Sequence, residues 1–441
     1  MELRDIVVTP LFIISVYIIA YFIRSKVTDS ITIRYFFPAL TVKIIGALAV
    51  GFVYQFYYNG GDTYDYHTSG SRVIWEAMVH NPLEGVKLLF SDVTEDPSLF
   101  KYGRQILFFK DRQSYFVVRI SAFFDLFTFS TYSATAVLFA LFAFSGAWVL
   151  FLTFYRLYPD FHRWIAFSCF FIPSVFFWGS GIFKDTITLS AVCWLTYAFS
   201  KMAFERKNIV LNLTIFIISA WLVFSIKKYI LLTFLPAIIL WFFAANVGRV
   251  KSLAGKVVLF PVTLFLVTVL GFLVMKKVGE NDERYDISKL AYTAKITAYD
   301  IRYGWGARMG EGSGYTLGDL DGTWQSMLPL APKAINVSLF RPYVWEVRNP
   351  LMALSALESL SLLLITLFLL YKVGLNFFKV VSNPEVLFCL IFSLVFAFAV
   401  GVSTYNFGTL SRYKIPLMPF YLLALGLIYY HYKRQCKSFE S

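Results

Sequence analysis

The stretch PALTVKIIGALAVGFVYQFYYNGGDTYDYH, residues 38–67, places two acids, Asp62 and Asp65, directly after a long apolar run. The run, residues 38–56, is long enough to cross a bilayer, because a transmembrane helix needs about 20 mainly apolar residues. Two glycines after the run allow a tight exit from such a helix. Similar runs recur through a chain that is 58% hydrophobic, so the sequence predicts an all-α polytopic membrane protein.

Eleven apolar runs recur along the 441 residues, and we expect them to form the helices of a single transmembrane domain, residues 1–441. The expected spans are residues 7–23, 38–56, 131–154, 164–180, 186–203, 209–225, 229–247, 257–275, 351–371, 385–403 and 414–431. An odd number of spans puts the two ends of the chain on opposite sides of the membrane.

Lys and Arg concentrate in one set of short loops, and this asymmetry predicts the orientation. The basic loops are residues 24–37, 155–163, 201–208, 248–256, 372–384 and the C-terminal tail. Because cytoplasmic loops collect Lys and Arg, we expect the N-terminus outside and the C-terminus in the cytoplasm, in a bacterial inner membrane. The net charge of +13 then reflects topology and an affinity for anionic membrane lipids, and we expect no nucleic-acid partner.

Two long segments, residues 57–130 and 276–350, fall on the outer side of this topology. The first ends in residues 114–130, which are apolar on one side apart from interruptions such as Asp125 and predict an interfacial helix lying on the membrane. The second contains the Gly-rich residues 302–322, which we expect to form a loop. Neither a phosphate-binding P-loop nor a dinucleotide fingerprint occurs, so we expect no such cofactor and no ATP-driven machine.

The motif GGDTYDYH, residues 60–67, is the first candidate for chemistry. Asp62, Asp65 and His67 can reach one outer cavity, where a carboxylate acts as a general base on a hydroxyl group and His67 contacts the substrate. The alternative is an Asx-turn or a helix cap at a helix exit. These three side chains could also bind a metal ion, but their spacing does not indicate one, and we assign no metal ligand.

A second motif is PSVFFWGSGIFKDTITLS, residues 173–190, in which Lys184 and Asp185 follow a Gly-Ser-Gly break between apolar helices. A helix that begins at this point favours anions at its N-terminus, so Lys184 can hold a phosphate while Asp185 caps the helix. The alternative is a short hairpin in which the two residues pair with each other.

Two further motifs bring cations to the outer side. LFRPYVWEVRNP, residues 339–350, joins Arg341 and Glu346 to aromatic residues, which can grip a phosphate and stack on a sugar, or anchor the chain at the interface. RYKIPLMP, residues 412–419, sets Arg412, Tyr413 and Lys414 before an apolar helix, either to hold a phosphate or to snorkel. Glu358 lies about two turns inside its span, where an ionisable group usually faces a cavity or a partner.

The pattern resembles the GT-C superfamily of integral-membrane glycosyltransferases, which includes the protein O-mannosyltransferases and the lipid A aminoarabinose transferases. These enzymes carry an acidic motif in the first outer loop, which GGDTYDYH resembles with Asp62 in the base position. Many also carry an Arg-Tyr-x-x-Pro-x-x-Pro stretch near a late helix, and RYKIPLMP at residues 412–419 is similar to it.

The resemblance implies transfer of a sugar from a polyprenyl-phosphate donor to a lipid or glycan acceptor on the outer face, as part of cell-envelope polysaccharide biosynthesis. One alternative is a polymerase or ligase for O-antigen or exopolysaccharide, which uses polyprenyl-diphosphate glycans and depends more on Arg341 and Arg412 than on Asp62. A further alternative is a non-enzymatic transporter or membrane-complex subunit. A transporter needs polar residues near the midplane of broken helices, and apart from Glu358 the helix middles carry little charge.

Overall fold

The computed structural model describes residues 2–90, 99–247, 269, 289–305 and 313–440. Helices dominate the described residues, which contain no β-strand and only one isolated antiparallel bridge, between Gly314 and Asn406. Eight of the described helices are long and apolar enough to cross a membrane, and one bent helix pair adds a ninth if it counts as one span. The predicted class of all-α polytopic membrane protein is therefore confirmed.

Nine of the eleven predicted spans coincide with these helices or with the bent pair. The span predicted at residues 257–275 lies, apart from residue 269, outside the described residues. The span predicted at 164–180 is not one helix but two, α9 (His162–Phe170) and α10 (Pro173–Trp178). The break has a local cause, because Pro173 disfavours helical backbone in the residue before it.

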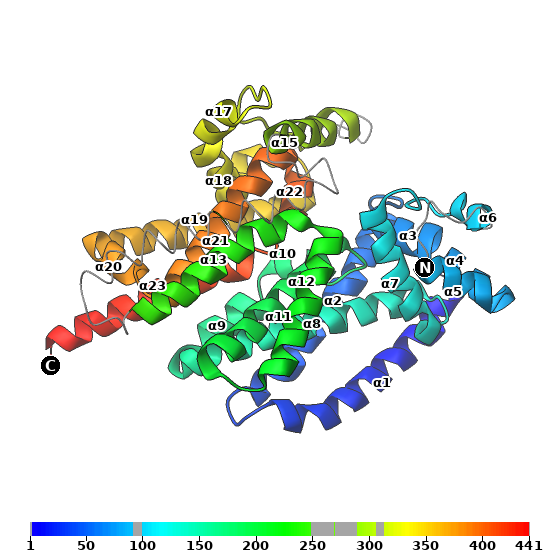
Figure 1. Cartoon of the computed structure of the whole chain (residues 1–441), viewed down its shortest axis with the longest axis horizontal. Helices are drawn as coiled ribbons and strands as arrows, with labels where there is room; N and C mark the ends of the chain where they lie inside the picture. Colours follow the sequence, from blue (N-terminus) through cyan, green and yellow to red (C-terminus); the bar gives the residue numbers. More distant parts are fainter. Residues whose placement is uncertain (1, 91–98, 248–268, 270–288, 306–312, 441) are drawn as a thin grey trace. The chain divides into compact units, whose positions relative to one another are not determined.

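The chain divides into two compact units. Unit 1 comprises Met1–Leu157 and Cys169–Lys228, and unit 2 comprises Tyr158–Ser168 and Tyr229–Ser441. The long helices of unit 1 are α1 (Leu3–Val27), α2 (Ile33–Phe56), α8 (Tyr132–Leu157), α11 (Lys184–Ser200, continued by the π-helical η4, Lys201–Glu205) and α12 (Ile209–Ile226) (Figure 1).

Within unit 1, α8 and α11 run parallel. Ser190 Oγ donates to Phe142 O at 2.7 Å near their middles, and Arg156 pairs with Glu205 at 3.5 Å near their ends. The chain between them must therefore lead back from the end of α8 to the start of α11, and it does so through the residues of α9 and α10.

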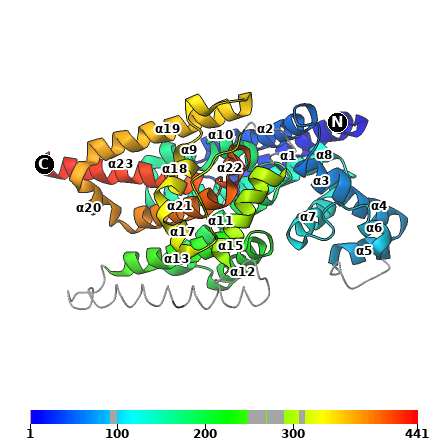
Figure 2. The same ribbon diagram turned by 90° about the horizontal axis from the view of Figure 1, so that it is seen from above.

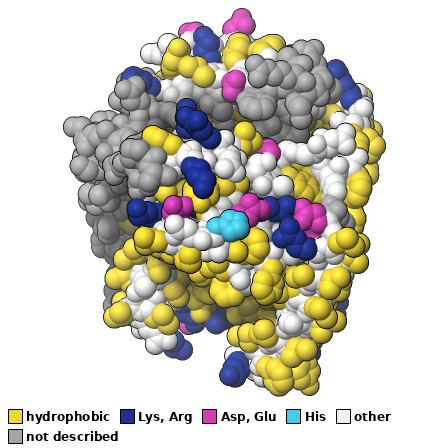
Figure 3. All heavy atoms as spheres, turned by 90° about the vertical axis from the view of Figure 1, so that its right-hand side faces the viewer, with side chains coloured by type: hydrophobic (Ala, Val, Ile, Leu, Met, Phe, Trp, Pro, Cys, Tyr) yellow, Lys and Arg dark blue, Asp and Glu magenta, His cyan; other side chains and the backbone are white. Residues whose placement is uncertain are grey.

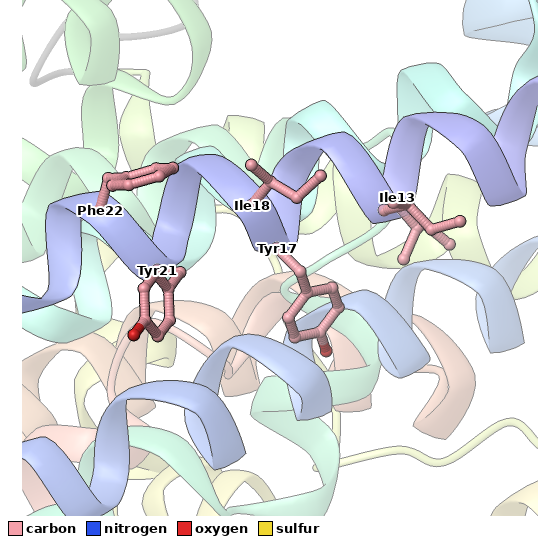
Figure 4. Close-up of a pocket in the computed structure, with 6 residues that line it drawn as sticks. Ile13, Tyr17, Ile18, Tyr21 and Phe22 are labelled. Atoms are coloured by element: carbon pink, nitrogen blue, oxygen red, sulfur yellow. The ribbon is translucent and has the colours of Figure 1, made fainter.

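The first helix, α1, is the most peripheral long helix of unit 1, with 17% of its apolar window buried. Tyr17 Oη and Thr41 Oγ1 of α2 are 2.5 Å apart and hold the two helices together. An open apolar groove follows α1 (Figure 4) and is lined by Ile13, Ile14, Tyr17, Ile18, Tyr21 and Phe22. Such an exposed apolar surface suits contact with lipid tails.

A cluster of short helices fills the segment between α2 and α8 (Figure 2). In chain order they are α3 (Asp62–Tyr66), the π-helical η1 (His67–Ser71), α4 (Arg72–His80), α5 (Pro82–Phe90), α6 (Phe100–Gly103) and α7 (Arg112–Thr128). The predicted interfacial helix at 114–130 corresponds to α7, whose one face is buried and includes Asp125, while Phe123 and Phe127 are exposed. Its contact with the membrane stays a prediction.

Unit 2 is built mainly from α13 (Lys228–Val247) and from α19 (Pro350–Val373), α21 (Pro384–Thr404) and α23 (Met418–Glu440), the last bent by 68° against α22 (Phe407–Tyr413). Shorter elements complete it: α15 (Leu290–Tyr299), η6 (Asp300–Trp305), α17 (Trp324–Met327), η7 (Leu328–Leu330), α18 (Ala331–Phe340), η8 (Val344–Glu346), η9 (Gly374–Asn376) and α20 (Phe377–Val381). The segment 302–322, predicted as a loop, begins in the helical η6 and is irregular in most of residues 313–322; residues 306–312 lie outside the description.

The face of the molecule in Figure 3 shows how its side chains are sorted. Hydrophobic side chains cover most of the lower part of this view, and acidic and basic side chains gather in a band across its middle.

Candidate functional site

The acidic motif forms a short structured connection between α2 and α8 in unit 1. Gly60 and Gly61 have φ values of 123° and 113°, which L-residues rarely adopt, so the glycines allow the turn after α2. The following helix α3 is tied to both long helices. Tyr64 Oη donates to Gly51 O at 3.2 Å, and Thr63 Oγ1 is 2.8 Å from Tyr132 Oη at the start of α8.

Asp65 has the electrostatic setting of a general base. It is half-buried, and no cation pairs with it among the described residues. Burial, and then the neighbouring charge of Asp62, raise the pKa of Asp65 above its usual value. A carboxylate with a raised pKa is a stronger base than an ordinary aspartate, and a stronger base accepts a hydroxyl proton more readily.

His67 follows Asp62 and Asp65 in the chain and lies in a buried polar cluster. Its side chain and that of Asp125 have 0% exposure, and His67 Nε2 is 3.4 Å from Asp125 Oδ1. The other Asp125 oxygen accepts from Ser71 Oγ at 2.6 Å, and Thr135 Oγ1 donates to Oδ1 at 2.6 Å. Because His67 has no exposed surface here, its predicted contact with a substrate receives no support from this arrangement.

The hairpin alternative predicts an ion pair between Lys184 and Asp185. The structure pairs each of them with a different residue. Lys184 Nζ is 3.3 Å from Asp111 Oδ2, and Asp185 pairs with Lys227 at the end of α12. Asp111 also caps α7 by accepting from Gln113 N at 3.2 Å. Burial raises the pKa of Asp111, but the charge of Lys184 and the hydrogen bonds to the carboxylate outweigh it, so the net pKa is lowered.

Short contacts connect the acidic motif to the Lys184 region. An added Cβ on Gly61 would lie 3.2 Å from the Tyr54 ring, whose centroid is 5.5 Å from that of Phe183, the neighbour of Lys184. On the other side, the rings of Tyr66 and Phe108 lie 4.8 Å apart, shortly before Asp111. The predicted acids and the cation Lys184 therefore lie at the same end of unit 1.

In unit 2, Arg341 and Glu346 form a two-pronged ion pair. Arg341 Nε donates to Glu346 Oε2 at 3.0 Å, and its Nη2 donates to the other carboxylate oxygen. The hydrogen bond to Glu346 raises the pKa of Arg341, opposed by burial. Trp345, 81% exposed, stacks on Tyr343 with ring centroids 4.7 Å apart. The pair and the aromatic stack form one surface at the start of α19.

The late motif comes to the same end of unit 2. Lys414 lies buried in the bend between α22 and α23, and its Nζ donates to Ser359 Oγ at 3.4 Å, while Ser359 donates to Arg341 O at 3.1 Å. Glu358 of α19 acts electrostatically on Lys414. Arg412 and Tyr413 precede the bend, with the Arg412 guanidinium 5.6 Å from the Tyr413 ring.

Most of the predicted phosphate-binding cations thus already face an acid. Lys184 faces Asp111, Arg341 faces Glu346, and Glu358 acts on Lys414. An incoming phosphate would have to replace or join the carboxylate in each of these pairs. The described residues contain no group of three or more His, Cys, Asp or Glu side chains that could hold a metal ion.

Sequence reasoning missed two residues. Lys43 lies in the middle of α2, fully buried, and its Nζ donates to Val175 O at 3.1 Å and Gly179 O at 3.2 Å, at the C-terminal end of α10. A single Lys inside an apolar span was a visible signal. Asp125 gave only a weak signal, as a charge interrupting an amphipathic helix.

Comparison with protein-family models, with curated proteins and with solved structures finds no match for this chain.

Proposed function

We propose that the chain is a membrane glycosyltransferase that moves a sugar from a polyprenyl-phosphate donor to an acceptor hydroxyl on the outer face of the membrane. The observation that carries the proposal is the carboxylate pair Asp62 and Asp65 at one end of unit 1. Asp65 has a raised pKa caused by burial and by the charge of Asp62, and no cation partner among the described residues. This is the setting expected of a general base.

The proposed step is a single displacement. Asp65 accepts the proton of the acceptor hydroxyl as its oxygen attacks the anomeric carbon of the sugar. The bond from that carbon to the phosphate oxygen breaks, and polyprenyl phosphate leaves with the electron pair. A cation stabilises the negative charge that develops on the phosphate. Lys184, at the same end of unit 1, can do so when the phosphate joins or replaces Asp111, and Arg341, Arg412 and Lys414 remain proposed phosphate ligands in unit 2.

The test is a transfer assay on the purified full-length chain in lipid nanodiscs, with a radiolabelled polyprenyl-phosphate sugar and an extract of envelope glycolipids as acceptor. We expect Asp65→Asn to lower the transfer rate about 100-fold or more, since a positioned general base contributes that much. Asp321→Asn is the control, because it makes the same substitution at an aspartate of unit 2, whose carboxylate accepts hydrogen bonds from Ser326 and Thr323 N. Full transfer by both Asp62→Asn and Asp65→Asn would refute the proposal.

A transporter is the second candidate, and two observations favour it. Lys43 lies in the middle of α2 and donates to carbonyl oxygens of the short helix α10, and the α22–α23 pair is bent by 68° at the segment that contains Lys414. Broken helices with ionisable groups at mid-membrane are typical of transporter sites. Flux of a labelled polyprenyl-phosphate sugar across proteoliposomes that is lost in Lys43→Met, together with absent transfer in wild type, would favour this candidate over the transferase.

A further inference from the structure

The buried polar cluster around Asp125 has no chemical role in the proposed function. Its hydrogen bonds point to a structural role. It joins three elements of unit 1: η1 supplies His67 and Ser71, α7 supplies Ser121 and Asp125, and α8 supplies Thr135. These five side chains have 0% exposure. A buried carboxylate is costly unless several donors surround it, and this one is surrounded on both oxygens.

The cluster is attached directly to the acidic motif. His67 and Ser71 are the first and last residues of η1, which follows α3 without a break, and α3 carries both Asp62 and Asp65. An added Cβ on Gly70 would lie 2.8 Å from the backbone oxygen of Asp65, within the same helical stretch, and 3.0 Å from Val118 of α7, so the π-helical turn packs tightly against α7. π-Helical turns of this kind are often retained at functional sites.

We infer that Asp125 is a positioning residue that holds the 62–71 segment against α7 and α8 and thereby keeps Asp62 and Asp65 close together and partly buried. The catalytic importance of this segment rests on the proposed function. The attachment of the segment by Asp125 does not. Asp125 Oδ2 holds the end of η1 through Ser71 at 2.6 Å, and Asp125 Oδ1 holds α8 through Thr135 at 2.6 Å. One carboxylate therefore clamps the acid-bearing segment to a long helix.

A second attachment holds α3 to the first turn of α8, independently of Asp125. Thr63 Oγ1 is 2.8 Å from Tyr132 Oη, and the Tyr132 ring packs against His67 with centroids 5.5 Å apart. Tyr132 and Thr135 both belong to the first turn of α8, so α3 and η1 are fastened to the same turn. Without Asp125, the first of these attachments remains and the second is lost.

The experiment measures the stability of residues 62–71 and the titration of Asp65, and it needs no knowledge of the substrate. The full chain in nanodiscs is studied by hydrogen exchange with mass spectrometry, and in parallel by carbodiimide labelling of carboxyl groups across pH, with fragmentation to separate Asp65 from Asp62. In Asp125→Ala we expect amide exchange in residues 62–71 to speed up about tenfold or more. The labelling midpoint of Asp65 should move to lower pH, because the loosened carboxyl regains water and moves away from Asp62, the charged group acting on it.

Two further variants separate loss of the Asp125 attachment from a general loss of folding. Thr135→Val removes one donor to Asp125 while keeping the shape of the side chain, so it should shift both readouts in the same direction but less, even if Asp125→Ala does not fold. Asp321→Ala, in unit 2, should leave both readouts at the wild-type values. Folded Asp125→Ala with unchanged exchange and an unchanged Asp65 midpoint would overturn the inference, and so would a uniform rise in exchange throughout unit 1.

If Asp125→Ala is not folded, wild-type behaviour of Thr135→Val overturns the inference equally. Failure of the proposed function looks different. In that case Asp65→Asn leaves transfer intact or no transfer is found, while the clamp readouts of Asp125→Ala still change.

Discussion

A carboxyl group beside a second carboxyl group titrates under the influence of its neighbour, and Asp62 and Asp65 form such a pair. Burial is the larger cause of the raised pKa of Asp65, and the charge of Asp62 adds to it. Both effects disfavour the charged form of Asp65, so the base form appears only at a higher pH than in an isolated aspartate. The pH at which activity rises should therefore report on the pair.

We expect Asp62→Asn to move the rising limb of the pH–rate profile to lower pH. The substitution removes one of the two causes of the raised pKa of Asp65, while burial remains. Initial rates of sugar transfer between pH 4 and pH 9 measure the shift, with Asp321→Asn as the control. A limb that stays in place, or moves to higher pH, would contradict the assignment of Asp65 as the base.

The Arg341–Glu346 pair predicts a pH-dependent contribution to stability in unit 2. Burial raises the pKa of Glu346, but the hydrogen bond from Arg341 and that from Tyr343 N outweigh it, so the folded pKa is below the unfolded value. The stabilisation is therefore present above the unfolded pKa and is lost as the pH falls through the folded pKa.

A double-mutant cycle with Arg341→Met and Glu346→Gln measures this pair by thermal unfolding in detergent. We expect a coupling free energy of about 1 kcal/mol near pH 7, because the two side chains are partly exposed and solvent screens them. The coupling should fall toward zero in strongly acidic buffer. A coupling free energy that grows as the pH falls would show that the folded pKa of Glu346 is not below its unfolded value.

At the scale of the helices, close packing in unit 1 depends on positions without a side chain. A Cβ on Gly46 of α2 would lie 2.0 Å from Phe176 O of α10, a backbone atom that cannot rotate away. Gly46 lies one turn from Lys43, whose ammonium binds carbonyls of the same short helix. One face of α2 therefore receives α10 through a small residue and a buried cation.

We expect Gly46→Ala to lower the free energy of unfolding by about 1–3 kcal/mol, because α2 and α10 must separate to admit the methyl group. Thermal unfolding of the purified chain is the measurement. Gly314→Ala is the control, since its added Cβ would meet no atom closer than 3.8 Å. Equal unfolding temperatures for Gly46→Ala and the wild type would show that the two helices are not packed in this way.

The elements differ in how far sequence could predict them. The long spans were predictable because an apolar run of bilayer length has few other stable conformations. Pro173 lies inside the predicted span 164–180, where the structure has two short helices in place of one. The short helices α3 to α6 have too few residues for a period to be recognised, and their packing comes from residues far apart in the chain.

The candidate site shows the same limit. Asp62, Asp65 and Lys184 could be expected at one end, because each borders an apolar run. The partner of Lys184 could not, since Asp111 lies 73 positions earlier in the chain. Asp125 contacts Ser71 and Thr135 only after α7 and α8 have packed, and neither the periodicity nor the spacing of the sequence predicts such contacts.

The orientation that the charges of the loops predict can be tested directly. Thr68 lies at the end of unit 1 that carries the acidic motif, and Lys207 lies beyond the opposite ends of α8 and α11; both residues are exposed. Cys169, Cys193 and Cys389 are buried, so only Cys436 needs replacement by serine before single cysteines are introduced.

We expect Thr68→Cys to react in intact cells with a membrane-impermeant maleimide, because the positive-inside rule places this end outside. Lys207→Cys should react only after the cells are made permeable. Gel-shift labelling of the two variants is the measurement. The reverse pattern would invert the orientation and put the acidic motif in the cytoplasm, where the proposed donor geometry does not apply.

The bond between Lys43 and the carbonyl of Val175 joins residues 132 positions apart, and this separation sets an order of events during synthesis. Helix α2 leaves the ribosome well before α10 exists, so Lys43 enters the membrane with no partner for its ammonium. A lysine at mid-span opposes insertion by about 2.5–3.5 kcal/mol, which the remaining apolar residues of α2 must outweigh. The nascent chain thus carries an uncompensated charge in its second span until α10 has been made.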